Sequence, residues 1–245
     1  STLPRIMSYY LKPETEQSNF PRITKAEEIR LCDPACGSGH MLVYAFDLLY
    51  HMYEEEGYEP TEIPRLILQN NLYGIEIDER AAELAAFALT MKARAKHRRF
   101  FVNPIQPNIS VVRKTLLKNT DVRYYFDFVG NNLFSNQLAD TLEQFRSADN
   151  FGSLIRPKLA DARPIRDQLK QKNAAENVLL YQTHEHILEA LQQAEFLSAK
   201  YHVVITNPPY MGNQGMNAEL TDFAKKNFAD TKTDLSAMFI ERCLE

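Results

Sequence analysis

The chain has 245 residues, of which 44% are apolar and 24% charged, with a formal net charge of −4. This composition is that of an ordinary globular protein, and the length allows one large domain or two small ones. The acidic balance excludes a uniformly basic nucleic-acid coat. The sequence has no apolar run of membrane-spanning length and no secretory signal pattern. Its three cysteines do not suggest a disulfide framework, so we expect a reducing, cytoplasmic compartment.

The predicted elements alternate between strand and helix over much of the chain. In chain order they are a strand over 28–32, a helix over 38–56, a shorter helix over 62–70, a strand over 72–77, a helix over 79–96, and strands over 109–112 and 202–206. The helices are predicted from apolar residues at helical spacing, and the strands from short apolar and β-branched runs. Strands separated by helices are typical of parallel βαβ units, so we expect a doubly wound α/β sheet.

Residues 117–198 interrupt this alternation. Their first part has no clear period, 156–172 is charged and contains two prolines, and 174–200 has the pattern of one long helix. We interpret 117–198 as a mostly helical insertion between the third and fourth strands. The chain opens on Ser1 rather than Met and stops at Glu245 inside an apolar helical pattern, so we expect a piece of a longer protein.

A turn that contains two glycines, Asp33–Gly39, follows the first predicted strand. Glycine lets a ligand approach the main chain, and the following helix offers free N–H groups. The turn lacks the third glycine of a dinucleotide fingerprint, and Asp33 suits a cationic group such as an amino acid ammonium. Glu76 ends the next strand, where doubly wound folds hold ribose hydroxyls. Together these residues indicate S-adenosylmethionine, and the alternative interpretation is a purely structural turn.

The last predicted strand ends in Asn207-Pro208-Pro209-Tyr210. The amide oxygen of Asn207 and the carbonyl of Pro208 can accept both hydrogens of an exocyclic amino group, and two prolines keep these acceptors rigid. The ring of Tyr210 can stack on the base that carries the amine. The tetrapeptide therefore predicts a planar amine as substrate.

These motifs resemble those of a known enzyme family. Asp33–Met41 resembles motif I of the amino-group DNA methyltransferases, and Asn207–Tyr210 resembles their motif IV in its adenine-N6 form. Motif I before motif IV is similar to the gamma order. Tyr73–Met91 resembles the motif II segment, and Thr233–Glu241 resembles the helix after motif IV. More narrowly, Leu31–Phe101 resembles the PglX family of BREX phage-defence methyltransferases, with type IIG restriction-modification methyltransferases as near neighbours.

The resemblance implies a fold and a division of the chain. The fold is α/β, a Rossmann-like class I methyltransferase with an incomplete doubly wound sheet. The expected segments are an N-terminal lead-in over 1–27, the cofactor-binding half of the core over 28–116, the insertion over 117–198, and the catalytic strand with its following helices over 199–245. The implied partners are double-stranded DNA, through a target-recognition domain outside this chain, and further subunits of a defence system. No membrane partner and no metal are implied.

The resemblance also implies a role for each motif residue. The cofactor set comprises Asp33, Ala35, Cys36, Gly37, Gly39, Glu76 and Ile77. In this set Asp33 and the turn backbone hold the methionine part of S-adenosylmethionine, Glu76 binds the ribose, and Ile77 packs on the adenine. The catalytic set comprises Asn207, Pro208, Pro209 and Tyr210. It receives N6 of a flipped-out adenine, on which the tyrosine ring stacks.

One family feature is absent, and alternatives stay open. An acidic residue usually follows the third strand, but Val112–Thr115 contains none, and Asp127 is a candidate substitute. Methyltransferases of RNA guanine-N2 or of a protein glutamine share the Asn-Pro-Pro-Tyr motif. A non-catalytic recognition or assembly subunit of a defence complex is the third hypothesis. We expect the isolated chain to bind cofactor weakly and to be inactive alone.

Several other residues are interpreted as structural. His184 and His186 lie on different faces of a helix, so we expect solvated side chains rather than a metal pair. Cys32 is expected to be buried. A group of aromatic residues is expected in the core, namely Phe100, Phe101, Tyr124, Tyr125 and Phe126.

Overall fold

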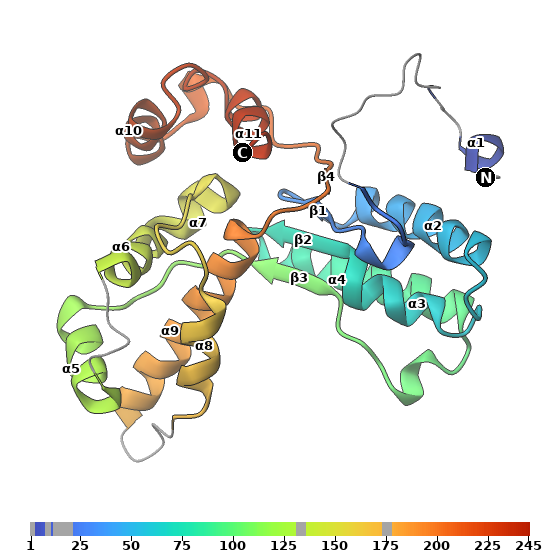
Figure 1. Cartoon of the computed structure of the whole chain (residues 1–245). Coiled ribbons are helices and arrows are strands. Elements are labelled where there is room, and N and C mark those ends of the chain that lie inside the picture. Colours follow the sequence, from blue (N-terminus) through green and yellow to red (C-terminus); the bar gives the residue numbers. More distant parts are fainter. Residues whose placement is uncertain (1–2, 8–10, 12–21, 131–135, 173–177) are drawn as a thin grey trace. The chain divides into compact units, whose positions relative to one another are not determined.

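The computed structural model describes residues 3–7, 11, 22–130, 136–172 and 178–245 (Figure 1). Much of the expected lead-in over 1–27 therefore lies outside the described residues. The chain divides into two compact units. The first, here called the α/β unit, comprises Ser1–Ile109 and Tyr201–Asn207. The second, the helical unit, comprises Ser110–Lys200 and Pro208–Glu245, and so combines the expected insertion with most of the segment after it.

A four-stranded sheet organises the α/β unit, with strand order β3-β2-β1-β4. The strands are β1 (Leu31–Asp33), β2 (Leu72–Glu76), β3 (Asn108–Val111, whose last two residues fall in the helical unit) and β4 (Val203–Val204). β1 pairs in parallel with both neighbours, so that Leu31 lies opposite Leu72 and Val203. The predicted parallel α/β class is confirmed. Since β1, β2 and β4 run in the same direction, their carboxyl ends meet at one edge of the sheet.

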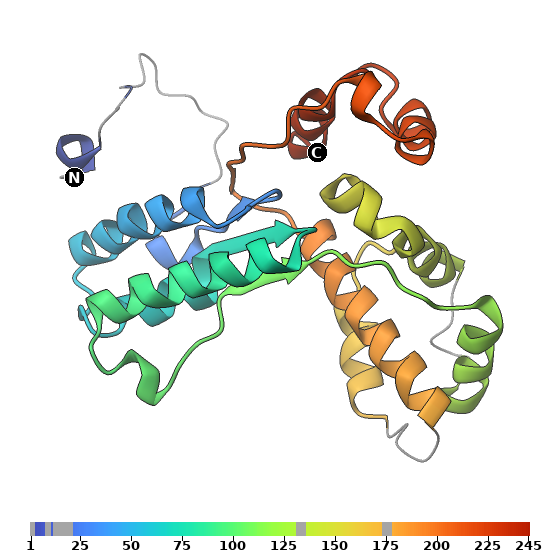
Figure 2. The same cartoon turned by 180° about the vertical axis from the view of Figure 1, so that it is seen from behind.

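The helices of this unit are α1 (Leu3–Ile6), α2 (His40–Glu55), α3 (Ile63–Leu66) and α4 (Glu79–Lys96). Figure 2 shows α4 packed along the strands. The bounds of α4 match the prediction because the Asp78 side chain caps its start, accepting from Ala81 N at 3.0 Å. The predicted helix over 62–70 is α3 followed by a π-helical turn, Ile67–Asn71. The predicted start of β1 at residue 28 was wrong, because Ala26–Glu28 forms a 3₁₀ turn instead.

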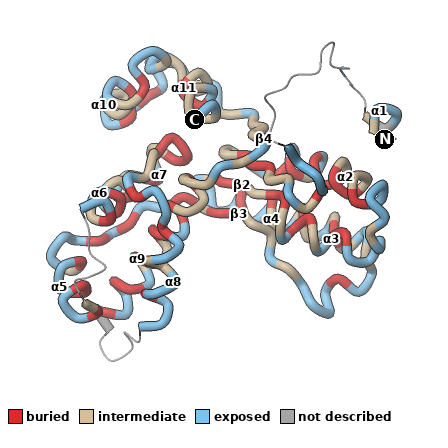
Figure 3. The backbone as a smooth tube through the Cα atoms, in the orientation of Figure 1, coloured by how far each residue is buried: buried red, intermediate tan, exposed pale blue. Residues whose placement is uncertain are grey.

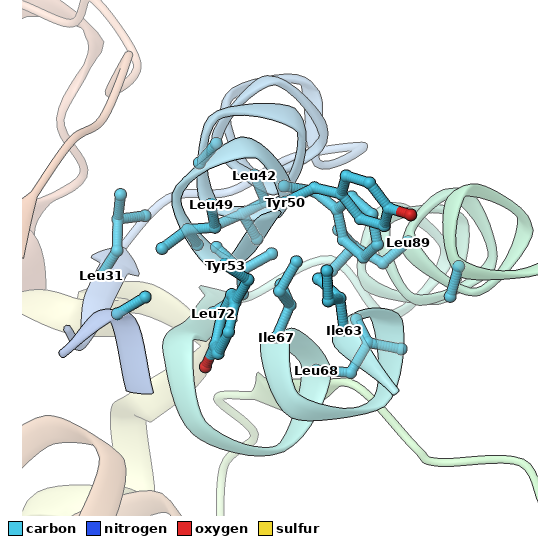
Figure 4. Close-up of a cluster of buried hydrophobic side chains, with 14 of the residues drawn as sticks. Leu31, Leu42, Leu49, Tyr50, Tyr53, Ile63, Ile67, Leu68, Leu72 and Leu89 are labelled. Atoms are coloured by element: carbon cyan, nitrogen blue, oxygen red, sulfur yellow. The ribbon is translucent and has the colours of Figure 1, made fainter. Parts of the chain in front are cut away.

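The core of the α/β unit lies where α2, α3 and α4 pack against β1 and β2. Figure 4 shows the buried side chains converging from these elements, among them Leu42, Tyr53, Ile67 and Leu89. The buried face of α2 includes Phe46 and two tyrosines, Tyr50 and Tyr53, beside its aliphatic residues. Burying each such side chain contributes about 1.5–3 kcal/mol, so this face anchors the turn that precedes α2.

A buried asparagine ties the segment before β1 to the segment before β2. Asn71 donates to the carbonyl oxygens of Ala26 and Ile29, both at 2.7 Å, and accepts from the Tyr53 hydroxyl at 2.9 Å. Every polar atom of this amide side chain is therefore bonded, which removes the cost of burying it. The network sets where both strands begin.

An arginine holds the short strand β4 against the sheet, at the end where β1, β2 and β4 begin. The Arg30 guanidinium lies against the rings of both Tyr73 and Tyr201, with its central carbon 4.7 and 5.1 Å from their centres, and the two rings contact each other, with centres 5.3 Å apart. Its backbone N–H donates to Nδ1 of His202 at 3.0 Å. Burial raises the pKa of Tyr201. These contacts secure the strand that carries the tetrapeptide although only Val203–Val204 are in strand geometry.

The helical unit contains seven α-helices among the described residues. They are α5 (Asn119–Val129), α6 (Asn136–Gln144), α7 (Ala148–Phe151), α8 (Arg163–Lys170), α9 (Val178–Ser198), α10 (Ala218–Asn227) and α11 (Leu235–Cys243). Buried and exposed faces alternate along these helices in Figure 3. No helix in the described ranges is both long and apolar enough to cross a lipid bilayer.

Two predictions about side chains were wrong. Phe101 and Tyr124 are half-exposed, whereas the other three aromatic residues of that group are buried. His184 is buried rather than solvated, because α5 packs on α9 and brings the hydroxyl of Tyr125 to 2.5 Å from its Nδ1. Burial lowers the pKa of His184 and raises that of Tyr125 to about 12, so both stay neutral near pH 7. The prediction that Cys32 is buried is confirmed.

Candidate cofactor and catalytic site

The turn after β1 depends on glycine for its shape. Gly37 and Gly39 have φ values of +51° and +84°, in the left-handed region. A Cβ atom on Gly39 would lie 3.0 Å from both Cα and Cβ of Ala85, on α4. The turn is closed by two hydrogen bonds, from Cys36 N to Ile75 O at 3.0 Å and from Gly39 N to Cys36 O at 2.8 Å. Glycine therefore lets α2 begin against α4 directly after the strand.

Gly74, in the middle of β2, is a further glycine that sequence reasoning missed. A Cβ atom there would lie 2.6 Å from Cδ1 of Ile109 and 3.0 Å from Sγ of Cys36. Because Gly74 carries only a hydrogen in place of a side chain, the turn after β1 can lie close to β2. A glycine inside an otherwise apolar strand often marks such a close approach, and that was the available signal.

The carboxylate of Glu76 faces the glycine turn. Its Oε2 accepts from Gly37 N at 2.7 Å, and its Oε1 accepts from the N–H groups of Ile77 and Asp78 at 2.9 and 3.1 Å. Two predicted cofactor residues, one in the turn after β1 and one at the end of β2, are thus in direct contact. A carboxylate has about four acceptor positions, so after accepting from three backbone N–H groups it can still accept from a ligand hydroxyl.

Asp33 is buried at the end of β1, where its Oδ1 accepts from Ala35 N at 3.2 Å. Burial raises the pKa of this carboxyl, and the charge of Glu76 adds to the effect, while the Thr206 hydroxyl and the Ala35 N–H oppose it. Thr206 was missed in the sequence. Its Oγ1 is buried and, among the described residues, makes no hydrogen bond of ordinary geometry. A cation placed beside this pair would favour the ionised form of Asp33.

Cys36 is a packing residue of the turn. Burial raises the pKa of its thiol to about 12, and the charges of Asp33 and Glu76 act in the same direction. Because the thiolate is the reactive form, this side chain is not a nucleophile at neutral pH. Its backbone carbonyl and N–H shape the turn, as described above.

Asn207, the first residue of the tetrapeptide, follows β4 at the same edge of the sheet. The backbone bond from Ile205 N to Cys32 O, at 3.0 Å, continues the pairing with β1 beyond Val204. Asn207, the last residue of the α/β unit, is exposed directly after Thr206, the neighbour of Asp33. Pro208 is half-buried, and Pro209 and Tyr210 are exposed, the tyrosine at 82%. Ile77 is half-exposed beside Glu76. These side chains are accessible to a ligand.

The segment after β3 provides no acid. Val112 is buried, the backbone N–H of Arg113 donates to Gln193 at 3.0 Å, and Lys114 pairs with Asp149. Asp127, the candidate substitute, lies on α5 of the helical unit and stays a prediction. Within the described part of the chain, no group of three or more His, Cys, Asp or Glu side chains could hold a metal ion.

Comparison with known proteins adds independent information. Residues 14–106 match the family model for the MmeI DNA-methyltransferase domain. The chain is 36% identical, over 98% of its length, to the adenine-specific methyltransferase BrxX of Escherichia coli O9:H4 (strain HS), and covers 23% of that protein. It is 34% identical, over 95% of its length, to the adenine-specific methyltransferase PglX of Lacticaseibacillus casei (strain Zhang), and covers 20% of it. The chain thus spans about a fifth of the length of these relatives.

These matches confirm the predicted resemblance to adenine-specific methyltransferases of the PglX and type IIG kind. A shorter match, 39% identical over 27% of the chain and 6% of the relative, is to a putative type II restriction enzyme and methyltransferase of Methanocaldococcus jannaschii. Residues 70–245 match the family model described as Eco57I restriction-modification methylase, which covers more than half of the chain. The chain therefore belongs to the Eco57I restriction-modification methylase family.

Proposed function

We propose that this chain is part of an enzyme that transfers a methyl group from S-adenosylmethionine to N6 of a flipped-out adenine in DNA. The setting is a phage-defence or restriction-modification system, in the cytoplasm. One observation carries the proposal: the carboxyl edge of a single parallel sheet brings together a buried acid, a glycine turn bonded to a second acid, and the start of Asn-Pro-Pro-Tyr. Family membership implies a methyl donor, and this arrangement supports the choice of donor.

The residues of the α/β unit fit the parts of S-adenosylmethionine. Asp33, with its raised pKa, gains most from a cationic partner, and the ammonium of the methionine part is such a group. Glu76 keeps acceptor capacity for a ribose hydroxyl after its three backbone bonds. Ile77 offers an exposed apolar side chain next to it for the adenine ring. When bound, the cofactor supplies an electrophilic methyl group on a sulfonium.

The tetrapeptide fits the methyl acceptor. The lone pair of an exocyclic amine is delocalised into the purine, so the amine is a weak nucleophile. Acceptors on both N–H bonds, from the Asn207 side chain and the Pro208 carbonyl, favour a pyramidal nitrogen and direct its lone pair outward. Catalysis then consists of positioning and charge stabilisation. Stacking on Tyr210 offsets about 1–3 kcal/mol of the cost of flipping the base out of the duplex.

We also infer how the chain is organised within a larger protein. Residues 28–116 form the cofactor-binding half of the core, 117–198 a helical insertion, and 199–245 the catalytic strand with its following helices. Target recognition on double-stranded DNA and contacts with defence partners are assigned to other parts of the full-length protein.

The test is methyl transfer by the full-length protein from labelled S-adenosylmethionine to duplex DNA, followed by digestion and identification of the modified nucleoside. We expect N6-methyladenine, and a loss of about 100-fold or more in Asn207→Ala. Asn103→Ala, at an exposed loop position of the same unit, serves as the matched control. Methylguanine in RNA or methylated glutamine would support the alternative substrates. Cofactor binding without transfer to any substrate, with Asn207→Ala indistinguishable from wild type, would refute the proposal.

A further inference from the structure

The residues after Tyr210 are tied to the start of α11. The carbonyl oxygen of Met211 accepts from Leu235 N at 2.8 Å, and Asn213 N donates to Thr233 O at 3.1 Å. Gly212 and Asp234 form an antiparallel bridge between these two bonds. The position of Tyr210 is therefore coupled, through a single intervening residue, to the amino end of α11.

An arginine from the other part of the helical unit holds α11. Arg156 Nη1 donates to Asn227 O at 2.6 Å, Nε donates to Glu245 at 2.7 Å, and Nη2 donates to Glu241 at 3.2 Å. The guanidinium also lies over the ring of Phe228, 4.1 Å from its centre. Hydrogen bonds to Glu245 and Glu241 raise the pKa of Arg156, so its guanidinium is charged at any ordinary pH. We call Arg156 and these partners on and after α11 the clasp. One rigid, planar side chain thus bridges the end of α10 and the far end of α11.

A second arginine extends the clasp from α11 to α9. Arg242 Nη2 donates to the carbonyl oxygen of Leu197, in the last turn of α9, at 2.6 Å, and to that of Ile155 at 3.4 Å. Along the chain, α9 leads into β4 and then into Asn207. The hydrogen bond between Arg242 and Leu197 therefore joins the two ends of the stretch that contains the tetrapeptide.

We propose that Arg156 and Arg242 are positioning residues for the catalytic tetrapeptide. Arg242 fixes α11 to the end of α9, Arg156 fixes it to the end of α10, and α11 in turn fixes Met211, the residue next to Tyr210. The inference rests on the function proposed above and gives the helical segment 117–198 a role in supporting the chain on which the methyl acceptor is held. A displacement of about 1 Å in such a group can cost about 100-fold in rate, so the coupling is large enough to measure.

The coupling can be tested without any methyl transfer, by hydrogen–deuterium exchange on the full-length protein. In Arg156→Ala we expect faster exchange at the amides of Leu235 and Asn213, which bond the chain after Tyr210. The amide of Cys36, in the glycine turn of the α/β unit, should be unchanged. Arg163→Ala is the matched control, because the ion pair of Arg163 with Asp161, two residues away, is exposed. Unchanged exchange at both reporter amides in Arg156→Ala would overturn the proposal.

Kinetics of the same variants separate positioning from general destabilisation. For Arg156→Ala we expect kcat to fall about 10- to 100-fold while KM for S-adenosylmethionine changes less than about twofold, since its proposed site lies in the α/β unit. Arg156→Lys, which keeps the charge but not the planar fork, should give an intermediate loss. If Arg156→Ala does not fold, Glu241→Gln should show the same pattern at smaller size.

The outcomes also separate this proposal from the proposed function. If kcat and the number of S-adenosylmethionine sites per protein both fell by the fraction of protein that is unfolded, the loss would reflect unfolding. That result would refute a positioning role. A wild-type protein that transfers no methyl group would refute the proposed function, and hydrogen exchange would still decide whether the clasp controls the chain after Tyr210.

Discussion

Replacing Gly39 by alanine tests why the turn between β1 and α2 requires glycine at this point. The residue has a φ of +84°, and the added Cβ would lie 3.0 Å from Cα and Cβ of Ala85. One of these atoms is backbone in the middle of α4, a helix whose buried face packs in the main core, so it cannot move aside cheaply. The substitution therefore combines backbone strain with steric overlap.

The two contributions can be estimated separately. A left-handed conformation costs a residue with a Cβ about 1–2 kcal/mol. Forcing an extra methyl group into a packed site costs about 1–3 kcal/mol. We therefore expect Gly39→Ala to lower the free energy of unfolding of the α/β unit by about 2–5 kcal/mol, a large fraction of the stability of an ordinary domain.

Two other glycines provide matched controls. Gly57 has a φ of +82° and Gly37 a φ of +51°, and in both cases a Cβ would meet no atom within 4 Å. Alanine at Gly57, away from the site, reports strain alone, about 1–2 kcal/mol. Alanine at Gly37 adds any effect on the cofactor turn, and this effect should appear in cofactor affinity rather than in further loss of stability.

The assay is urea unfolding followed by far-ultraviolet circular dichroism, with isothermal titration of S-adenosylmethionine on the folded variants. Gly39→Ala should be clearly less stable than Gly57→Ala, because only Gly39 lies against Ala85. An equal loss of unfolding free energy in the two variants would show that the close contact between the turn and Ala85 does not contribute to the effect. Partial rescue by Ala85→Gly in the Gly39→Ala background would identify the steric part directly.

Two further predictions concern buried titratable groups. Because burial raises the pKa of Asp33, the folded chain binds its proton more tightly than the unfolded chain, so stability should fall as pH rises from the ordinary carboxyl range through that raised pKa. Asp33→Asn should abolish this fall, and identical pH profiles of urea unfolding for the two proteins would contradict the argument. Tyr125→Phe leaves Nδ1 of His184 buried without its hydrogen-bond partner and should lower the unfolding free energy by about 1–3 kcal/mol. Tyr124→Phe, at the half-exposed neighbour, should change the unfolding free energy by less than about 0.5 kcal/mol. Similar losses in the two tyrosine variants would refute this account.

The α/β part of the fold was predictable because its signals are local. Residues 79–96 have alanine and leucine at helical spacing and directly follow a capping aspartate, Asp78, and the observed helix has the predicted bounds. The strand predicted over 202–206 is confirmed in place but is only two residues long. Its position depends on Arg30 and the two tyrosines beside it, which are contacts between residues remote in sequence. Local patterns contain no information about such contacts.

The same distinction holds for the candidate site. Asp33 and Glu76 were predicted to bind the cofactor from their places at the ends of strands, and the structure brings both to one edge of the sheet, because parallel strands end at a common edge. Thr206 and Gly74 were missed because their roles depend on which residues lie opposite, namely Asp33 in one case and Ile109 with Cys36 in the other. His184 was misassigned for the same reason, because its partner comes from another helix. Residue type and spacing indicate the chemistry of a site, whereas its packing requires the fold.

The partners of Arg156 show why the organisation of residues 117–198 was hard to predict. Arg156 lies in a charged stretch that contains two prolines, and no local pattern in this stretch predicts these partners. Its acceptors lie at Asn227, Glu241 and Glu245, more than 70 positions further along the chain. In the proposal above, these bonds let the helical segment support the chain that carries the tetrapeptide. Such support requires particular long-range partners and not a repeating local pattern.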